Sequence, residues 1–187
     1  MGAHEYDLHL QKRIILIFME EAGMSLRFGI LTVSDRSARG ERPDLSGPAL
    51  VELVRSHGWT VGQVAVLADE LDDLRNLLIA WADGGGLDVI LTTGGTGFSP
   101  RDHTPEATRL VIQREAPGLA EAMRSESHKD TPHAMLSRAV AGIRGRTLIV
   151  NLPGSPKAAQ ENLRVILPVL PHAVELLRGS SEAEQHH

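Results

Sequence analysis

Apolar, strand-like runs alternate with amphipathic helical segments along most of this chain. Strand-like runs occupy residues 27–33, 59–67 and 87–92, and segments with apolar residues at helical spacing lie between them. Strands that alternate with helices in this way usually form a mostly parallel sheet with helices on both faces. The pattern therefore predicts a three-layer, Rossmann-like α/β fold.

The second half of the chain continues the alternation. Thr104 is expected as the N-cap of a helix, because Pro105 suits the first helical position and Glu106 complements the positive end of the helix dipole. Further elements are expected at 119–125 (helix), 135–142 and 146–151 (adjacent strands), 156–167 and 171–177 (helices). In such folds ligands bind beyond the carboxyl ends of the strands, so the loops there are the first candidates for a site.

The periodic pattern covers most of the sequence but not its ends. It begins at Leu26 and fades after residue 179, and a chain of 187 residues has the length of one ordinary domain. We therefore expect one domain at 26–179. An N-terminal extension at 1–25, to which no role is assigned, precedes it, and a C-terminal tail at 180–187 follows it.

Composition excludes several classes of function. A net charge of -5 repels nucleic acids and acidic membranes, so an anionic ligand needs a local basic pocket. The absence of cysteine removes disulfides, thiolate nucleophiles and Cys-ligated metals, and agrees with a cytoplasmic protein. The apolar run at 14–19 is too short for a signal peptide or a membrane span. We expect neither nucleic-acid nor membrane partners.

Three loops follow predicted strands and are expected to meet at one edge of the sheet. Glycines in the second loop allow backbone N–H groups to approach a phosphate, and Lys157 in the third could reach phosphate oxygens. A Gly-rich turn can equally serve backbone geometry alone, and Lys157 can be a solvated surface residue. No GxxxxGK[ST] or GxGxxG motif is present, which disfavours ordinary P-loop and dinucleotide sites. The loops contain Ser34, Asp35 and Arg36; Gly94, Gly95, Thr96 and Gly97; and Pro153, Gly154, Ser155 and Lys157.

Two carboxylates could project toward the same edge. Asp69 follows the second predicted strand and Asp102 follows the Gly-rich loop. Magnesium prefers oxygen ligands and often uses one or two carboxylates together with substrate phosphates, so the pair is a candidate Mg²⁺ site. A helix cap at Asp69 and a loop-stabilising hydrogen bond at Asp102 are the structural alternatives. His103 lies beside Asp102 without any metal-binding spacing.

The stretch TTGGTGFSPRDHTPEA at 92–107 resembles the MogA family, especially the G domain of gephyrin. The resemblance covers about residues 26–179 and implies a MogA-like fold. Further matching segments lie at 34–36, 114–118, 135–138, 142–145 and 151–157.

The resemblance implies transfer of AMP from ATP to the terminal phosphate of molybdopterin, with release of pyrophosphate. It further implies Mg²⁺, a homotrimer, and delivery of the product to a MoeA-like metal-insertion protein. By motif, Asp69 and Asp102 match the essential acidic pair, and the residues already given for the second and third loops match the nucleotide and phosphate site. The pterin side matches Ser34, Asp35, Arg36, Ser137 and Arg138.

One position departs from the resemblance, and one alternative function stays open. His103 stands where valine is expected in relatives, and its side chain is expected to point away from the substrates.

A terminal phosphate is anionic at neutral pH, so its attack on the α-phosphorus needs no protein nucleophile. The alternative is a non-catalytic, molybdopterin-binding MoaB-like paralogue or scaffold. The presence of both aspartates favours the enzyme.

Overall fold

A computed structural model describes residues 25–179 of the chain. The expected tail at 180–187 and the expected N-terminal extension, apart from Ser25, lie outside the described residues.

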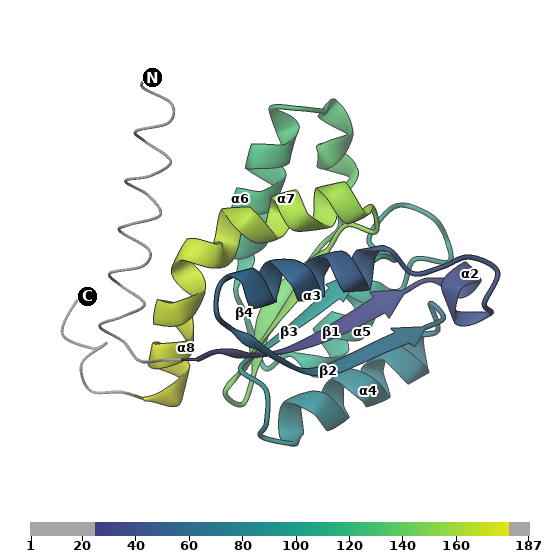
Figure 1. The fold of residues 1–187 in the computed structure, drawn as a ribbon. Coiled ribbons are helices and arrows are strands. Elements are labelled where there is room, and N and C mark those ends of the chain that lie inside the picture. The colour runs from purple at the N-terminus through teal and green to yellow at the C-terminus, as the bar shows by residue number, and fades with distance from the viewer. Residues whose placement is uncertain (1–24, 180–187) are drawn as a thin grey trace.

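Six strands form one sheet in the order β2-β1-β3-β6-β5-β4 (Figure 1). The four neighbouring strands β2, β1, β3 and β6 are parallel, whereas β5 is antiparallel to both β6 and β4. The mostly parallel sheet predicted from the sequence is therefore confirmed. The strands are β1 (Arg27–Val33), β2 (Thr60–Leu67), β3 (Val89–Thr93), β4 (Arg114–Glu115), β5 (Ala141–Arg144) and β6 (Thr147–Leu152).

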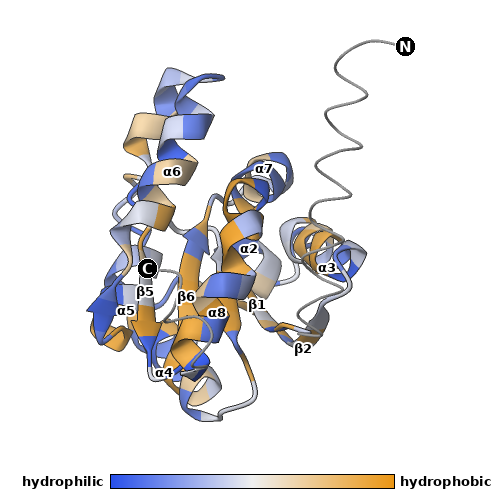
Figure 2. Ribbon diagram, turned by 90° about the vertical axis from the view of Figure 1, so that its left-hand side faces the viewer, coloured by the Kyte–Doolittle hydropathy of each residue, from blue (hydrophilic) through white to orange (hydrophobic). Residues whose placement is uncertain are grey.

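Helices cover both faces of the sheet, which gives the three expected layers (Figures 1 and 2). Phe28 and Ile30 of β1 pack toward α3, α6, α7 and α8, whereas Leu31 and Val33 pack toward α4 and α5. Figure 2 shows the hydrophobic residues gathered on the central strands and on the helix faces turned toward them. The α-helices are α2 (Asp35–Ala38), α3 (Ser46–Ser56), α4 (Leu71–Asp83), α5 (Thr104–Val111), α6 (Pro117–His128), α7 (Pro156–Ile166) and α8 (Leu170–Arg178); η1 (Pro132–Leu136) and η2 (Leu167–Val169) are 3-10 helices. Among the described residues, no helix combines the length and apolar character needed to cross a membrane.

The predicted strand at 135–142 is wrong for most of its length. The 3-10 helix η1 occupies its start, and Thr131 caps that helix by accepting a hydrogen bond from the His133 amide at 3.3 Å. The chain then turns toward the Gly-rich loop, where the Arg138 amide donates to the Thr96 carbonyl at 2.9 Å. The strand β5 forms only from Ala141 onward because the earlier amides are bound by other partners. The short elements α2 and β4 were not predicted.

The N-cap of α5 lies one residue earlier than predicted. His103 occupies that position and Thr104 is the first helical residue, with its buried hydroxyl lacking a hydrogen-bond partner. The amides at the start of this helix are bound by other loops: His103 donates to Asp69 Oδ1 at 2.9 Å and Thr104 donates to the Gly95 carbonyl at 3.2 Å. Tertiary partners therefore replace the expected side-chain cap.

The order of the strands fixes where a ligand crevice can form. The chain passes from β1 to β2 on one side, and then returns to place β3 on the other side of β1. Loops at such a switch point diverge and leave a crevice beyond the carboxyl ends of the strands. The loops that follow β1 and β3 carry the residues singled out from the sequence.

The side chain of Asn151 joins three elements inside the core. Its Nδ2 donates to the Oγ1 atoms of Thr92 and Thr108, at 2.9 and 2.8 Å, and its Oδ1 accepts from the Val140 amide at 3.1 Å. Asn151 is fully buried, so these groups cannot be compensated by water without opening the core.

Asn151→Ala is expected to lower the free energy of unfolding by about 2 kcal/mol, because it leaves buried polar groups without partners. Denaturant unfolding measures this change, and Asn76→Ala on the exposed side of α4 is the control. Equal stability of the two variants would contradict a structural role for Asn151.

Candidate active site

The Gly-rich loop lies between the carboxyl ends of β1 and β6. Gly94 has a φ of 105°, and a Cβ there would lie 2.2 Å from the Val33 carbonyl oxygen. Its amide donates to the Leu152 carbonyl at 3.2 Å, and a Cβ on Gly154 would lie 3.2 Å from the Gly94 Cα. The second and third loops predicted from the sequence are thus brought into contact, and glycine is required at position 94.

Asp69 lies beneath this loop. The residue is 5% exposed, and a Cβ on Gly95 would lie 2.2 Å from Asp69 Oδ2. Its Oδ1 accepts from the His103 amide, and its own amide donates to Asp35 Oδ1 at 2.9 Å. Asp69 therefore connects the loops that follow β1, β2 and β3, and Asp35 supports it from the first of them.

Burial raises the pKa of Asp69 from 3.8 to about 6. The hydrogen bond from the His103 amide opposes this rise, whereas the negative charge of Asp102 adds to it. An ionised Asp69 is thus incompletely compensated by its protein surroundings. A bound cation would provide the missing compensation.

Asp102 lies in a surface hollow at the same end of the sheet. Its Oδ2 accepts from the Ser99 amide at 3.2 Å, and a Cβ on Gly97 would lie 2.9 Å from that oxygen. The hollow is lined by Phe98, Ser99, Pro100, Asp102, His103, Glu106 and Arg138.

The acidic pair fits a magnesium ion that substrate phosphates help to hold. Residues 25–179 contain no group of three or more His, Cys, Asp or Glu side chains arranged around a common metal position. Within the same range, Asp69 Oδ2 and Asp102 Oδ1 accept no hydrogen bond. Two hard oxygen ligands with unused capacity match the way Mg²⁺ binds in phosphate-transfer sites.

Two arginines at this edge, Arg101 and Arg138, are already paired with acids. Arg101 donates to Asp35 at 3.1 Å and to Glu70 at 2.8 Å. The side chain of Lys157 is 86% exposed, and its Nζ lies 3.7 Å from Glu161 Oε1. This ion pair is long, so a phosphate could readily replace Glu161 as the partner of Lys157. Among the described residues Arg36 forms no ion pair. Lys157 and Arg36 are therefore available to an anionic ligand, and so is Arg42, which donates to Ser34 Oγ at 3.2 Å and forms no ion pair among the described residues.

Arg138 supports the Gly-rich loop from below. Its guanidinium donates to the Gly97 carbonyl at 2.6 Å, to the Asp102 carbonyl at 2.7 Å and to the Glu106 carboxylate. Ser137 lies beside it and accepts from the Ala139 amide at 3.4 Å. The contact of Arg138 and Ser137 with a pterin stays a prediction, and the sequence did not predict the support that Arg138 gives to the loop.

His103 contributes to the site through its backbone. Its amide binds Asp69, and its side chain is half-buried in the residues that line the hollow around Asp102. Any residue except proline would supply the same amide, so the valine expected in relatives would preserve this contact. The orientation of the imidazole toward a substrate stays a prediction.

Two hydroxyl residues that the sequence analysis did not select bind the third loop. Thr93 Oγ1 donates to the Pro153 carbonyl at 2.6 Å, and Ser46 Oγ donates to the Gly154 carbonyl at 2.8 Å. The sequence signal for Ser46 is the segment DLSGP at 44–48, in which an acid precedes Ser-Gly-Pro at a helix start.

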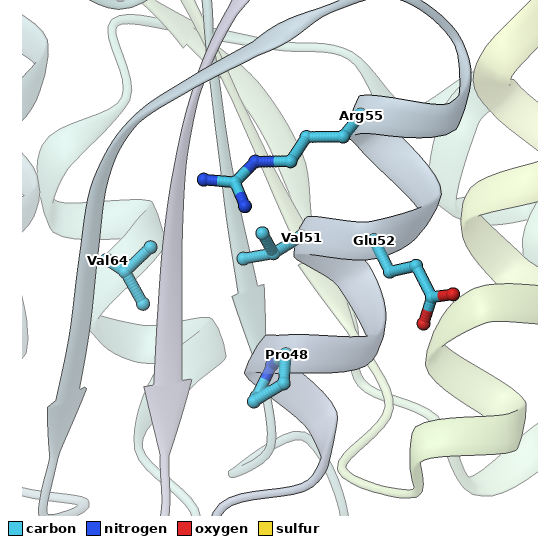
Figure 3. A pocket seen from close by; sticks show the side chains of 5 residues that line it. All are labelled: Pro48, Val51, Glu52, Arg55 and Val64. Atoms are coloured by element: carbon cyan, nitrogen blue, oxygen red, sulfur yellow. The ribbon is translucent and has the colours of Figure 1, made fainter.

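A second hollow lies away from these loops, between α3 and β2 (Figure 3). Pro48, Val51 and Arg55 of α3 face Val64 of the edge strand across it, and Glu52 points away. None of the site residues predicted from the sequence lines it.

A family model described as a probable molybdopterin binding domain matches residues 29–172. The chain is 47% identical over 157 residues to the molybdenum cofactor synthesis protein cinnamon of Drosophila melanogaster, and 42% identical over 171 residues to gephyrin of Dictyostelium discoideum. These matches cover 82% and 84% of the chain but only 26% and 24% of the two proteins. The chain thus spans about a quarter of each.

Other relatives have nearly the length of the matched region. A molybdopterin adenylyltransferase of Helicobacter pylori is 42% identical over 158 residues, which cover 83% of this chain and 90% of that protein. Among solved structures, MoaB of Thermus thermophilus is 54% identical with a TM-score of 0.78 and covers 83% of this chain and 98% of its own. A MogA structure is 42% identical with a TM-score of 0.77, over 81% of this chain and 99% of that one. The chain therefore belongs to the molybdopterin binding domain family, together with relatives that are named molybdopterin adenylyltransferase.

Proposed function

We propose that this chain is a molybdopterin adenylyltransferase, which transfers AMP from ATP to the terminal phosphate of molybdopterin and releases pyrophosphate. The observation that carries the proposal is the buried Asp69 beneath Gly95, with Asp102 in the adjoining hollow. Two relatives that are matched over 90% and 87% of their own length are named molybdopterin adenylyltransferase, which agrees with a role in molybdenum cofactor biosynthesis.

The proposed reaction asks little acid–base chemistry of the protein. A phosphate oxygen of molybdopterin attacks the α-phosphorus of ATP, and the bond from that phosphorus to the pyrophosphate oxygen breaks. The nucleophile is already anionic, so no proton needs to be removed. The sequence contains no cysteine and no GxSxG motif, which would form a nucleophile elbow, and both absences are consistent with this route.

The work left to the protein is to align two anions and to neutralise their charge. Asp69 and Asp102 would hold Mg²⁺, which supplies positive charge to the phosphates of ATP. The glycine loop would let backbone amides approach those phosphates, and Lys157 would bind them from α7. Ser34, Asp35, Arg36, Ser137 and Arg138 would lie on the pterin side.

Assembly, delivery and location are further parts of the proposal. A homotrimer and delivery of adenylylated molybdopterin to a MoeA-like protein are expected from the family resemblance. A cytoplasmic location is expected from the cysteine-free composition.

The second candidate is a MoaB-like protein that binds molybdopterin without catalysis. The 54% identity to the Thermus thermophilus structure described as the molybdopterin biosynthesis enzyme MoaB shows the likeness to MoaB, but that description names an enzyme and does not itself favour binding without catalysis. The two candidates differ in one result, because a binding protein would retain pterin and release no pyrophosphate from ATP.

Asp102→Asn is expected to lower the adenylylation rate about a hundredfold, because it removes charge that holds the metal. Molybdopterin affinity should stay nearly normal. Asp69→Asn should behave alike, and the double variant should be little worse than either single one, because both groups serve one ion. Rates are measured against magnesium concentration, with Asp73→Asn on the exposed start of α4 as control.

Near-normal turnover in both single variants would contradict the proposal that Asp69 and Asp102 hold the metal. Lost pterin affinity with unchanged magnesium dependence would assign the two acids to the pterin pocket instead.

The raised pKa of Asp69 predicts a pH-dependent stability in metal-free buffer. Its folded pKa of about 6 exceeds the ordinary 3.8, so the folded state binds the proton more tightly than the unfolded state does. The free energy of unfolding should therefore fall as pH rises through this interval. Asp69→Asn keeps an acceptor for the His103 amide and removes this dependence.

Thermal unfolding in the presence of a chelator should show Asp69→Asn gaining stability over the parent protein between about pH 4 and about pH 7. If the difference in unfolding temperature between the two proteins does not change with pH, burial of the ionised carboxylate is compensated and the prediction is wrong.

A further inference from the structure

The hydroxyl of Ser46 binds a loop on the other side of the site. Ser46 begins α3, is 6% exposed, and donates from Oγ to the carbonyl of Gly154 at 2.8 Å. Building on the proposed function, we infer that Ser46 and Thr93 are positioning residues, which fix the peptides of the third loop so that the amides of Gly154 and Ser155 are presented to a substrate phosphate.

Two consecutive carbonyls of this loop are held by hydroxyls of two residues that lie far earlier in the sequence. Thr93, at the end of β3, binds the Pro153 carbonyl at 2.6 Å, and Ser46, at the start of α3, binds the carbonyl of the next residue. Thr93 and Ser46 belong to a strand and a helix, which hold their hydroxyls in place. Rotation of either peptide of the loop would therefore break its hydrogen bond.

Holding the carbonyls also orients the amides that follow. In a trans peptide the C=O and the next N–H point in opposite directions. No peptide bond in residues 25–179 is cis. The amide of Gly154 therefore points away from Thr93, and that of Ser155 points away from Ser46. Both residues are exposed, and within the described chain neither amide has a hydrogen-bond acceptor.

Two adjacent free amides before a helix are a suitable arrangement for an anion. The second of them precedes α7, an eleven-residue helix whose first turn also includes Lys157. The fixed peptides thus place two donors directly before the turn that carries Lys157, whose side chain is exposed.

Ser46 is itself held in place by Asp44. Asp44 Oδ1 accepts from the amides of Ser46 and Gly47 at 2.9 and 3.1 Å, and its Oδ2 accepts from Thr32 Oγ1 at 2.8 Å. A Cβ on Gly47 would lie 2.5 Å from that Oδ2, so glycine is required for the close turn. A continuous chain of hydrogen bonds therefore runs from β1 to the third loop.

The chain offers a matched pair of serines for the test. Ser56 ends the same helix, its Oγ donates to the Leu53 carbonyl at 2.7 Å, and it makes no hydrogen bond to the third loop. Ser46→Ala and Ser56→Ala each remove one hydroxyl-to-carbonyl bond from α3. Only the first should affect phosphate binding.

Binding of inorganic pyrophosphate and of ATP is measured by calorimetry with magnesium present, beside KM for ATP, kcat and the unfolding temperature. Ser46→Ala should weaken both affinities about fivefold, the effect of losing one hydrogen bond, and raise KM more than it lowers kcat. Ser46→Thr should recover most of the affinity, and Ser56→Ala should bind like the parent protein. Thr93→Val should weaken the same binding and serves as the second variant if Ser46→Ala does not fold.

Normal pyrophosphate affinity in both Ser46→Ala and Thr93→Val, whatever their unfolding temperatures, would reduce these hydroxyls to fold stabilisers and overturn the inference. Failure of the parent protein to bind either probe would overturn it as well. A protein that binds the probes, loses that binding in Ser46→Ala and yet releases no pyrophosphate would support the inference while refuting the proposed enzymatic function.

Discussion

The close contact between Gly95 and the carboxylate of Asp69 determines how the loops of this protein can be arranged. Any side chain at position 95 would overlap Asp69 Oδ2, and the position also has a φ of 63°, which favours glycine. Because the loop lies directly on the acid, Asp69 is removed from water and its pKa rises to about 6. The amide of His103 binds the same carboxylate, and Asp35 accepts from the backbone amide of Asp69, so this residue is fixed at the ends of three strands.

The fold places two like charges, those of Asp69 and Asp102, close together, and hydrogen bonds hold the loops around them. Asp69 and Asp102 are like charges near one another, and one of them is buried, which disfavours the metal-free folded state. Around the pair, Arg138 holds the Gly-rich loop through two carbonyls, and Thr93 and Ser46 hold the third loop through two more. Under the proposed function, a site held in this way would need little reorganisation to bind a cation and phosphates.

Local patterns predicted the parts of the fold that depend on burial. The apolar runs of β1 and β3, and the glycines that follow β3, carry their own signal because burial inside the sheet favours apolar side chains and the close contacts at Gly94 and Gly95 exclude a Cβ. The segment at 135–142 was assigned wrongly because its amides bind Thr96 and Asn151, which are remote in sequence. The support by Arg138 and the bond from Ser46 to Gly154, 108 residues away, were missed for the same reason.

The central claim concerns which bond of ATP is broken, and labelled nucleotide tests it most directly. The purified protein is mixed with molybdopterin, magnesium and ATP labelled either at the α- or at the γ-phosphate. Adenylylation predicts that label from the α-phosphate enters the pterin in equal amount to the pyrophosphate released, while label from the γ-phosphate appears only in pyrophosphate. Transfer of the γ-label to the pterin, or bound pterin without transfer of either label, would contradict the account.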